Sequence, residues 1–224
     1  MSAPDMVIRA RDVRLVLGGA EPVEILRGID LEVRAGESVA LLGASGSGKS
    51  SLMAVLSGLE RATGGQVLVN GQDFGVLDED RLAVARRGRI GIVLQAFHLL
   101  PTMTARENVA VPMELANLPD AQARAETELA AVGLAHRLDH YPSQLSGGEQ
   151  QRVAIARALA PAPSIVFADE PTGNLDGATG RRIIDLLFER QRASGASLVI
   201  ITHDPALGQR CDRTLEMVDG RLVA

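Results

Sequence analysis

The sequence is poor in several kinds of residue, and each shortage excludes a class of protein. Cys211 is the only cysteine among 224 residues, so no internal disulfide can form, and we expect a buried thiol in a reducing compartment. No apolar stretch approaches the roughly 18–20 residues that span a bilayer, and we expect no signal peptide at the N-terminus. The net charge is −5, without dense basic runs, which argues against non-specific binding of nucleic acid. We therefore expect a cytoplasmic protein that reaches a membrane only through a partner.

Lysine is as scarce as cysteine. Lys49 is the only lysine, so the other basic residues, 22 (23 − 1), are all arginines. It lies in Gly43-Ala44-Ser45-Gly46-Ser47-Gly48-Lys49-Ser50, which fits the phosphate-binding pattern G-x-x-x-x-G-K-[ST]. A compact ammonium on a flexible stem can reach between β- and γ-phosphates, where the planar guanidinium of arginine is too bulky. The Ser50 hydroxyl suits Mg²⁺. This segment, the phosphate-binding loop, predicts that the chain binds a nucleoside triphosphate.

The residues on either side favour this interpretation over a glycine-rich turn that fits the pattern by chance. Ser38–Leu42 is apolar and predicts a buried strand. A helical spacing of Leu52, Val55, Leu56 and Leu59 follows the loop. A helix that begins near Lys49 would point its positive end at the phosphates.

The first part of the chain predicts mainly strands. Alternating segments indicate separate short strands at 7–11 and 13–17, and again at 25–26 and 29–33. Ile90–Leu94 is apolar throughout, which predicts a central strand buried on both faces.

The middle of the chain changes character to helix. No strand signal occurs from Ala96 to Pro161, and Thr104 with Glu107 fits a capping box at a helix start. Strands and helices alternate again from Ser164, and Asp219-Gly220 predicts the turn of a C-terminal hairpin. A βα core interrupted by a helical insertion is the organisation that these patterns predict.

Two carboxylates follow the apolar strand Ile165–Ala168. Because sites in open parallel sheets lie at the carboxyl ends of the strands, Asp169 and Glu170 are expected to face the same crevice as the phosphate-binding loop. Asp169 fits the role of holding Mg²⁺, directly or through water, and Glu170 can orient and activate an attacking water. The alternative is an acidic pair in solvent, which the loop in the same chain disfavours.

Gln95 and His203 follow two other predicted strands. The Gln95 amide is suited to reach Mg²⁺ or the attacking water without adding charge, and His203 to bond the γ-phosphate and the water. Each residue taken singly is equally consistent with a structural role.

The signature segment, Leu145-Ser146-Gly147-Gly148-Glu149-Gln150, precedes a long helical pattern. A small hydroxyl, two glycines that allow close backbone approach and a helix N-terminus predict a second anion site. Either the chain binds two phosphate groups, or this site serves the nucleotide of a neighbouring copy. The residues alone leave both possibilities open.

Together with Asn174-Leu175-Asp176, these elements resemble the ATP-binding subunits of ABC transporters over essentially the whole chain. The resemblance implies an α/β fold: a RecA-like P-loop NTPase core with an N-terminal antiparallel β subdomain (1–95 and 163–224) and an inserted α-helical subdomain (96–162). It implies a homodimer formed on ATP binding, with each ATP between the loop of one copy and Ser146–Gly148 of the other. Glu170 is then the catalytic base, His203 a switch, and Asp176 a link between the two sites.

The resemblance also implies the cofactors, ATP and Mg²⁺, and the residues that hold them. The ATP-binding residues are Gly43, Ala44, Ser45, Gly46, Ser47, Gly48, Lys49, Ser50, Ser51 and Gln95. The Mg²⁺ ligands are Ser50, Gln95 and Asp169. The residues that act on the opposing ATP are Leu145, Ser146, Gly147, Gly148, Glu149 and Gln150.

Other segments resemble one branch of this family in particular. Gln95–Pro101, Glu107–Val109 and Ala168–Asp176 look like the LolD/MacB branch, which serves FtsX-type permeases in lipoprotein release and macrolide export. Leu138–Pro142 and Arg210–Arg213 look most like YbbA-type ATPases. This implies an FtsX/MacB-type permease as partner, no nucleic acid, and a place on the inner face of the cell membrane. Phe97–Pro101 is expected to border the groove for the permease, unless that loop faces the core.

Four other classes of protein compete with this interpretation. A GTPase needs a base-reading Asn-Lys-x-Asp segment, and the sole lysine is already in the phosphate-binding loop. A small-molecule kinase has no use for the signature segment. A non-transport ABC ATPase usually carries paired domains, coiled coils or basic extensions, and this sequence shows none of them. An ABC subunit of a conventional importer or exporter is the main alternative.

One feature departs from the ABC pattern. ABC subunits usually stack adenine on an aromatic residue of the first strands, but residues 1–42 contain no Phe, Tyr or Trp. Val16 or Leu17 occupies the stacking position. Losing an aromatic platform costs on the order of 1 kcal/mol, so we expect modest ATP affinity and weak selectivity for adenine.

Overall fold

The computed structural model describes residues 6–18 and 21–223. The expectation of no signal peptide concerns the start of the chain, and residues 1–5 lie outside the described part. The chain forms two compact units. Met1–Arg86 and Ser197–Ala224 make up the first unit, and Arg87–Ala196 makes up the second. Within the described residues, no helix is both long and apolar enough to cross a membrane.

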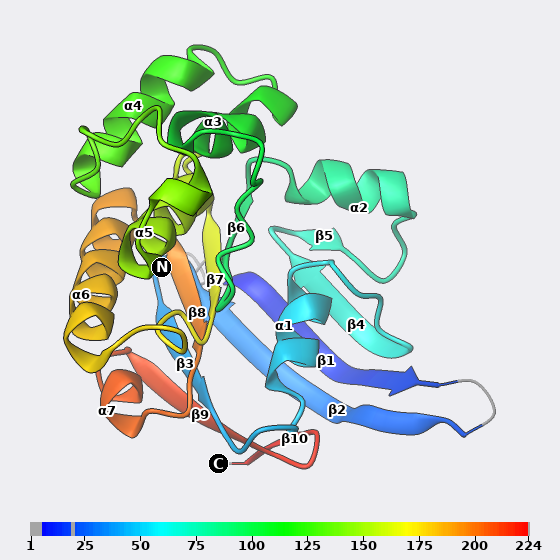
Figure 1. The fold of residues 1–224 in the computed structure, drawn as a ribbon. Helices are drawn as coiled ribbons and strands as arrows, with labels where there is room; N and C mark the ends of the chain where they lie inside the picture. Colours follow the sequence, from blue (N-terminus) through cyan, green and yellow to red (C-terminus); the bar gives the residue numbers. More distant parts are fainter. Residues whose placement is uncertain (1–5, 19–20, 224) are drawn as a thin grey trace, which may run out of the picture. The chain divides into compact units, whose positions relative to one another are not determined.

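An antiparallel sheet with the strand order β2-β1-β4-β5 forms one part of the first unit. Its strands are β1 (Met6–Leu17), β2 (Val23–Arg34), β4 (Gly64–Val69) and β5 (Gln72–Asp73). Figure 1 shows β1 and β2 running side by side as long ribbons.

The prediction of separate short strands before residue 34 is therefore wrong. The register of β1 against β2 shifts between Ala10 and Val13, and Asp12 has a left-handed φ of 46°. A bulge of this kind interrupts the alternation of side chains without ending the strand. For this reason the sequence pattern breaks where the strand continues.

The other part of the first unit is built on β3 (Ser38–Leu42), which pairs in parallel with β8 (Ser197–Ile201) and with β9 (Arg213–Val218). A hairpin then adds β10 (Arg221–Val223) antiparallel to β9 and confirms the predicted turn at Asp219-Gly220. The helices of this unit are α1 (Lys49–Leu56), α2 (Glu79–Arg86) and α7 (Pro205–Gly208).

The second unit combines a parallel pair of strands with the helices. The strands are β6 (Ile90–Val93) and β7 (Ile165–Asp169). The helices are α3 (Ala105–Leu115), α4 (Ala121–Ala131), the short 3₁₀ helix η1 (Pro142–Gln144), α5 (Gly147–Leu159) and α6 (Gly177–Ser194). The Thr104–Glu107 capping box at the start of α3 is present as predicted. Buried side chains of α3, α4 and α5, such as Met113, Leu129 and Val153, share one hydrophobic cluster.

The expectation that Ile90–Leu94 is buried on both faces is wrong. Gly91 and Val93 are buried, but Ile90, Ile92 and Leu94 are only partly so. A side chain at Gly91 would lie 2.3 Å from the carbonyl oxygen of Ala158, so α5 packs directly on one face of β6. The other face is less completely covered.

Candidate functional site

The phosphate-binding loop connects β3 to α1 in a shape that depends on its glycines. Gly43, Gly46 and Gly48 have positive φ angles of 150°, 79° and 104°. A Cβ atom on Gly43 would lie 2.3 Å from the carbonyl oxygen of Met217, and one on Gly48 would lie 2.9 Å from the Met217 Cε. Any other residue would be strained at both positions, and at Gly43 it would also collide with the backbone of β9.

The ammonium of Lys49 is held inside this loop. Lys49 is 8% exposed, and its Nζ donates to the carbonyl oxygens of Gly43 at 2.8 Å and Ala44 at 2.7 Å. Over the described residues, no carboxylate forms an ion pair with it. A buried cation at the start of α1 that pairs with no carboxylate of the described residues is suited to an anion such as a phosphate group.

His203 follows β8 as predicted and is exposed. Because β3 and β8 are parallel neighbours, the phosphate-binding loop and His203 both follow carboxyl ends at one edge of the sheet. The backbone N–H of Thr202 donates to the carbonyl of Leu41 at 3.2 Å, which continues this pairing beyond β8. In the first unit the structure thus brings the loop and His203 to the same rim.

In the second unit, Gln95 and the two carboxylates likewise lie at the carboxyl ends of two neighbouring parallel strands. Gln95 follows β6, and Asp169 and Glu170 lie at the end of β7, its parallel neighbour. Glu170 has a φ of 43°, a left-handed conformation that is strained for a residue with a side chain. Such strain is concentrated at functional sites, which supports the assignment of a special role to this position.

An amide pair that the sequence analysis missed joins Gln95 to Asn174. The Asn174 Nδ2 donates to the Gln95 carbonyl oxygen at 2.9 Å, and the Gln95 Nε2 donates to the Asn174 Oδ1 at 3.4 Å. Any Cβ at Gly173 would approach the Gln95 Nε2 to 2.6 Å. The segment after β6 and the segment before α6 are therefore in direct contact.

Asp176 has a local role as the N-cap of α6. Its Oδ1 accepts hydrogen bonds from the backbone N–H groups of Thr179 and Ala178, at 3.0 Å each. These bonds hold the pKa of Asp176 below its usual value. The carboxylate fixes the direction in which the chain enters α6, next to Asn174.

The loop at Phe97–His98 is held by a partly buried arginine. Phe97 and His98 have left-handed φ angles of 59° and 47°, and Arg157 of α5 donates to their carbonyl oxygens at 2.7 and 2.6 Å. Burial lowers the pKa of Arg157. Leu100, further along the loop, is 42% exposed, so an apolar side chain is available at the surface here.

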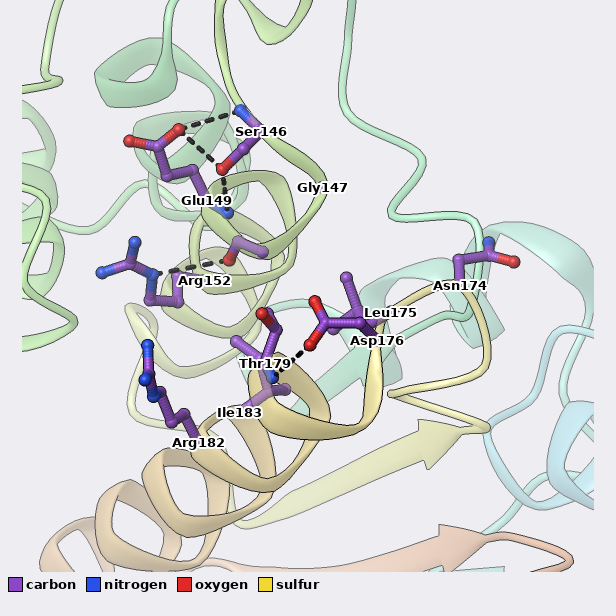
Figure 2. Close-up of a pocket in the computed structure, with 11 residues that line it drawn as sticks. Ser146, Gly147, Glu149, Arg152, Asn174, Leu175, Asp176, Thr179, Arg182 and Ile183 are labelled. Atoms are coloured by element: carbon purple, nitrogen blue, oxygen red, sulfur yellow. Dashed lines mark hydrogen bonds between the residues drawn. The ribbon is translucent and has the colours of Figure 1, made fainter.

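The signature segment forms one wall of a pocket of about 450 Å³, with the start of α6 as the other wall (Figure 2). Helices α5 and α6 approach closely here: a Cβ atom on Gly148 of α5 would lie 2.7 Å from the Cγ2 of Thr179 of α6. The pocket is lined by Ser146, Gly147, Gly148, Glu149, Arg152, Asn174, Leu175, Asp176, Thr179, Arg182 and Ile183.

Ser146 caps α5, and Glu149 completes a capping box that the sequence analysis did not predict. The Glu149 Oε2 accepts from the backbone N–H and the hydroxyl of Ser146, both at 2.8 Å, while the Glu149 N–H donates to the Ser146 Oγ at 3.3 Å. Figure 2 shows these bonds at the first turn of the helix. The Ser146 hydroxyl is thereby held at the N-terminus of α5, beside the backbone of the two glycines.

This capping box predicts a dependence of stability on pH. Hydrogen bonds from the Ser146 backbone and hydroxyl, with a further contribution from Arg137, lower the pKa of Glu149 from 4.5 to about 2. A carboxylate with a lowered pKa stabilises the fold above its unfolded pKa and loses that contribution as the pH falls from about 4.5 towards 2. Glu149→Gln is therefore expected to unfold more easily than the wild type at pH 6, by up to about 2–3 kcal/mol.

Urea denaturation at pH 6 and at pH 3 checks this expectation. The difference in the free energy of unfolding between wild type and Glu149→Gln is expected to shrink at pH 3. An equal difference at both pH values would show that the ionised carboxylate does not support the cap.

Comparison with known proteins identifies the family. A model of the ABC transporter family matches residues 26–173, more than half of the chain. The chain is 49% identical over 206 residues to the uncharacterized ABC transporter ATP-binding protein YbbA of Escherichia coli strain K12, covering 91% of this chain and 90% of YbbA. It is 51% identical over 211 residues to the lipoprotein-releasing system ATP-binding protein LolD of Anaeromyxobacter dehalogenans, covering 93% and 88%.

Two further similarities extend this result. The chain is 46% identical over 224 residues to the macrolide export ATP-binding/permease protein MacB of Marinobacter nauticus, covering 99% of this chain but 35% of MacB. Among solved structures, the dimeric post-hydrolysis state of the ATP-binding cassette MJ0796 bound to ADP and Pi matches with a TM-score of 0.89 and 36% identity, over 97% of each chain.

These matches confirm the predicted fold class, a P-loop NTPase with an antiparallel β part and a helical part. They also confirm the predicted similarity to YbbA, LolD and MacB ATPases. The chain belongs to the ABC transporter family, as one of its ATP-hydrolysing, ATP-binding cassettes.

Proposed function

We propose that the chain energises an FtsX/MacB-type permease in a membrane complex, through a homodimer that closes on ATP and reopens after hydrolysis. The observation that carries the proposal is the buried Lys49 ammonium in the glycine loop, held by carbonyl oxygens at 2.7 and 2.8 Å. An entering triphosphate gives this cation an anionic partner, while the loop N–H groups and the start of α1 receive the phosphates.

The other site residues have complementary roles. Ser50, Gln95 and Asp169 offer the oxygen ligands that Mg²⁺ prefers and would hold the ion, which neutralises charge on the phosphates. Glu170 orients the attacking water and accepts its proton, while His203 donates a hydrogen bond to the γ-phosphate. In the dimer, Ser146–Gly148 of one copy binds the ATP of the other copy, and Asp176 links the two sites.

Similarity supports a permease as the partner. MacB is an ATP-binding/permease protein of which this chain spans about a third, 35%, whereas LolD and YbbA are matched over most of their length. In the proposed complex, this ATP-binding part lies on the cytoplasmic face of the membrane against the permease. The exposed Leu100 and its neighbours from Phe97 to Pro101 offer the docking surface.

Affinity capture from native membranes tests the partner. Tagged Glu170→Gln in Mg²⁺-ATP is expected to recover an FtsX-like permease with a large periplasmic domain. The control is a Glu170→Gln, Lys49→Ala double variant, which is expected to recover much less of it. A conventional many-span permease would support the importer or exporter alternative, and recovery of only ribosomal or DNA-repair proteins would contradict a transporter role.

The missing aromatic residue predicts weak selection of the base. Val16 and Leu17 at the end of β1 are 37% and 42% exposed, so an aliphatic surface replaces a ring. Because stacking is worth on the order of 1 kcal/mol, GTP hydrolysis is expected to lie within about tenfold of ATP hydrolysis at equal concentration. Steady-state phosphate release with each nucleotide checks this, and a much slower rate with GTP would contradict it.

A further inference from the structure

We propose that Arg137 is a positioning residue for Ser146 of the signature segment. Arg137 holds the Glu149 carboxylate that orients Ser146, and it offsets the negative charge of that carboxylate where the phosphate binds. The inference rests on the proposed function, because it concerns the Ser146 that acts on the opposing ATP. Arg137 lies in the loop between α4 and η1, outside the signature segment. It acts on Ser146 through Glu149.

The two oxygens of Glu149 have separate partners. Oε2 accepts both hydrogen bonds from Ser146, at 2.8 Å each, and Oε1 accepts from the Arg137 Nε at 3.0 Å. Arg137 is itself held by a contact of 2.9 Å between its Nη1 and the Nε2 of His140. Since arginine can only donate, the Nε2 of His140 accepts here. The guanidinium therefore fixes the carboxylate in the orientation that places the Ser146 hydroxyl.

The pair is sheltered enough for its charges to matter. The Glu149 side chain is 13% exposed and that of Arg137 is 34% exposed. Charges at such positions interact more strongly than charges in open water. The Glu149 carboxylate is ionised at neutral pH, as its pKa of about 2 requires.

An ionised carboxylate beside Ser146 presents a difficulty for the proposed site. The Ser146 hydroxyl has a single hydrogen, which it donates to Glu149 at 2.8 Å, and it must turn that hydrogen away from Glu149 to donate to a γ-phosphate. Without Arg137, the incoming phosphate would meet an uncompensated negative charge one hydrogen bond away from its donor. With Arg137 in place, the carboxylate keeps its positioning function and its repulsion of the phosphate is reduced.

A double-mutant cycle tests this role in the full-length chain. Arg137→Met is expected to raise the ATP concentration for half-maximal hydrolysis by roughly tenfold, because it leaves the carboxylate uncompensated. In a Glu149→Gln background, where no charge needs compensation, the same Arg137→Met change is expected to alter that concentration by less than about twofold. In each background, the half-maximal ATP concentration with Arg137→Met is divided by the one without it. The activity of Glu149→Gln itself therefore does not enter the comparison.

Two further variants separate charge from structure. Arg106→Met is the matched control, since the Arg106 side chain is 35% exposed and pairs with Glu126 at 2.8 Å and with Asp139 at 2.7 Å. It is expected to leave the half-maximal ATP concentration unchanged. Arg137→Lys keeps the charge without the planar fork and is expected to recover part of the loss.

An equal loss from Arg137→Met in both backgrounds would overturn the inference, because a purely structural arginine does not depend on the charge of Glu149. So would a loss from Arg106→Met as large as that from Arg137→Met. Absence of ATP hydrolysis by the wild type would overturn both this inference and the proposed function. The wild-type rate alone distinguishes that outcome from the first two.

Discussion

Replacing Glu170 with glutamine is expected to lower the turnover of ATP by a hundredfold or more while ATP binding stays nearly unchanged. Glu170 follows the buried strand β7, and its φ of 43° sets the side chain at the end of that strand. An amide of the same shape cannot take a proton from water, and general-base catalysis contributes roughly 10²–10⁴-fold to a rate. Because the phosphate-binding loop is untouched, affinity has no reason to fall.

Phosphate release and equilibrium binding of a fluorescent ATP analogue, measured on the same preparation, check this expectation. Asp185→Asn is a suitable control, because Asp185 is an exposed acid of α6 outside the proposed site. Near-normal hydrolysis by Glu170→Gln would show that another residue acts as the base.

Replacing Lys49 with alanine is expected to abolish binding and hydrolysis together. The loop would keep its glycine geometry but lose its buried cation, which has only carbonyl and hydroxyl partners in the described residues. Lys49→Arg is the sharper variant, since it retains the charge. It is expected to fail as well, because a planar guanidinium does not fit between the phosphates.

Binding of the same ATP analogue to wild type, Lys49→Ala and Lys49→Arg tests the claim, with thermal unfolding to confirm that all three are folded. Retention of normal affinity by Lys49→Ala would contradict the assignment of the loop. Retention by Lys49→Arg alone would show that charge, and not shape, is what the site requires.

Local patterns predicted the parts of the site that local residues build. The glycine loop and the helix that starts at Lys49 are each made by neighbours in the chain. For the same reason, the Thr104–Glu107 capping box was predicted correctly. Physical rules for turns and helix ends suffice for such elements.

Contacts between distant segments were not predictable in this way. The bulge near Asp12 made one long strand look like two, and the exposure of Ile92 depends on which face of β6 is covered by α5. The Gln95–Asn174 pair joins residues 79 positions apart. The Arg137–Glu149 ion pair spans 12 positions, a spacing that belongs to no regular element. Such pairs depend on how helices and strands pack, which no pattern of hydrophobic residues specifies.

In the proposed dimer, each ATP is bound between the phosphate-binding loop of one copy and the signature segment of another. Sedimentation velocity of Glu170→Gln, with and without Mg²⁺-ATP, tests it most directly when compared with a Glu170→Gln, Ser146→Arg double variant. A dimer is expected only with ATP and only with Ser146 intact. A protein that binds ATP but stays monomeric, or a dimer that Ser146→Arg does not weaken, would contradict it.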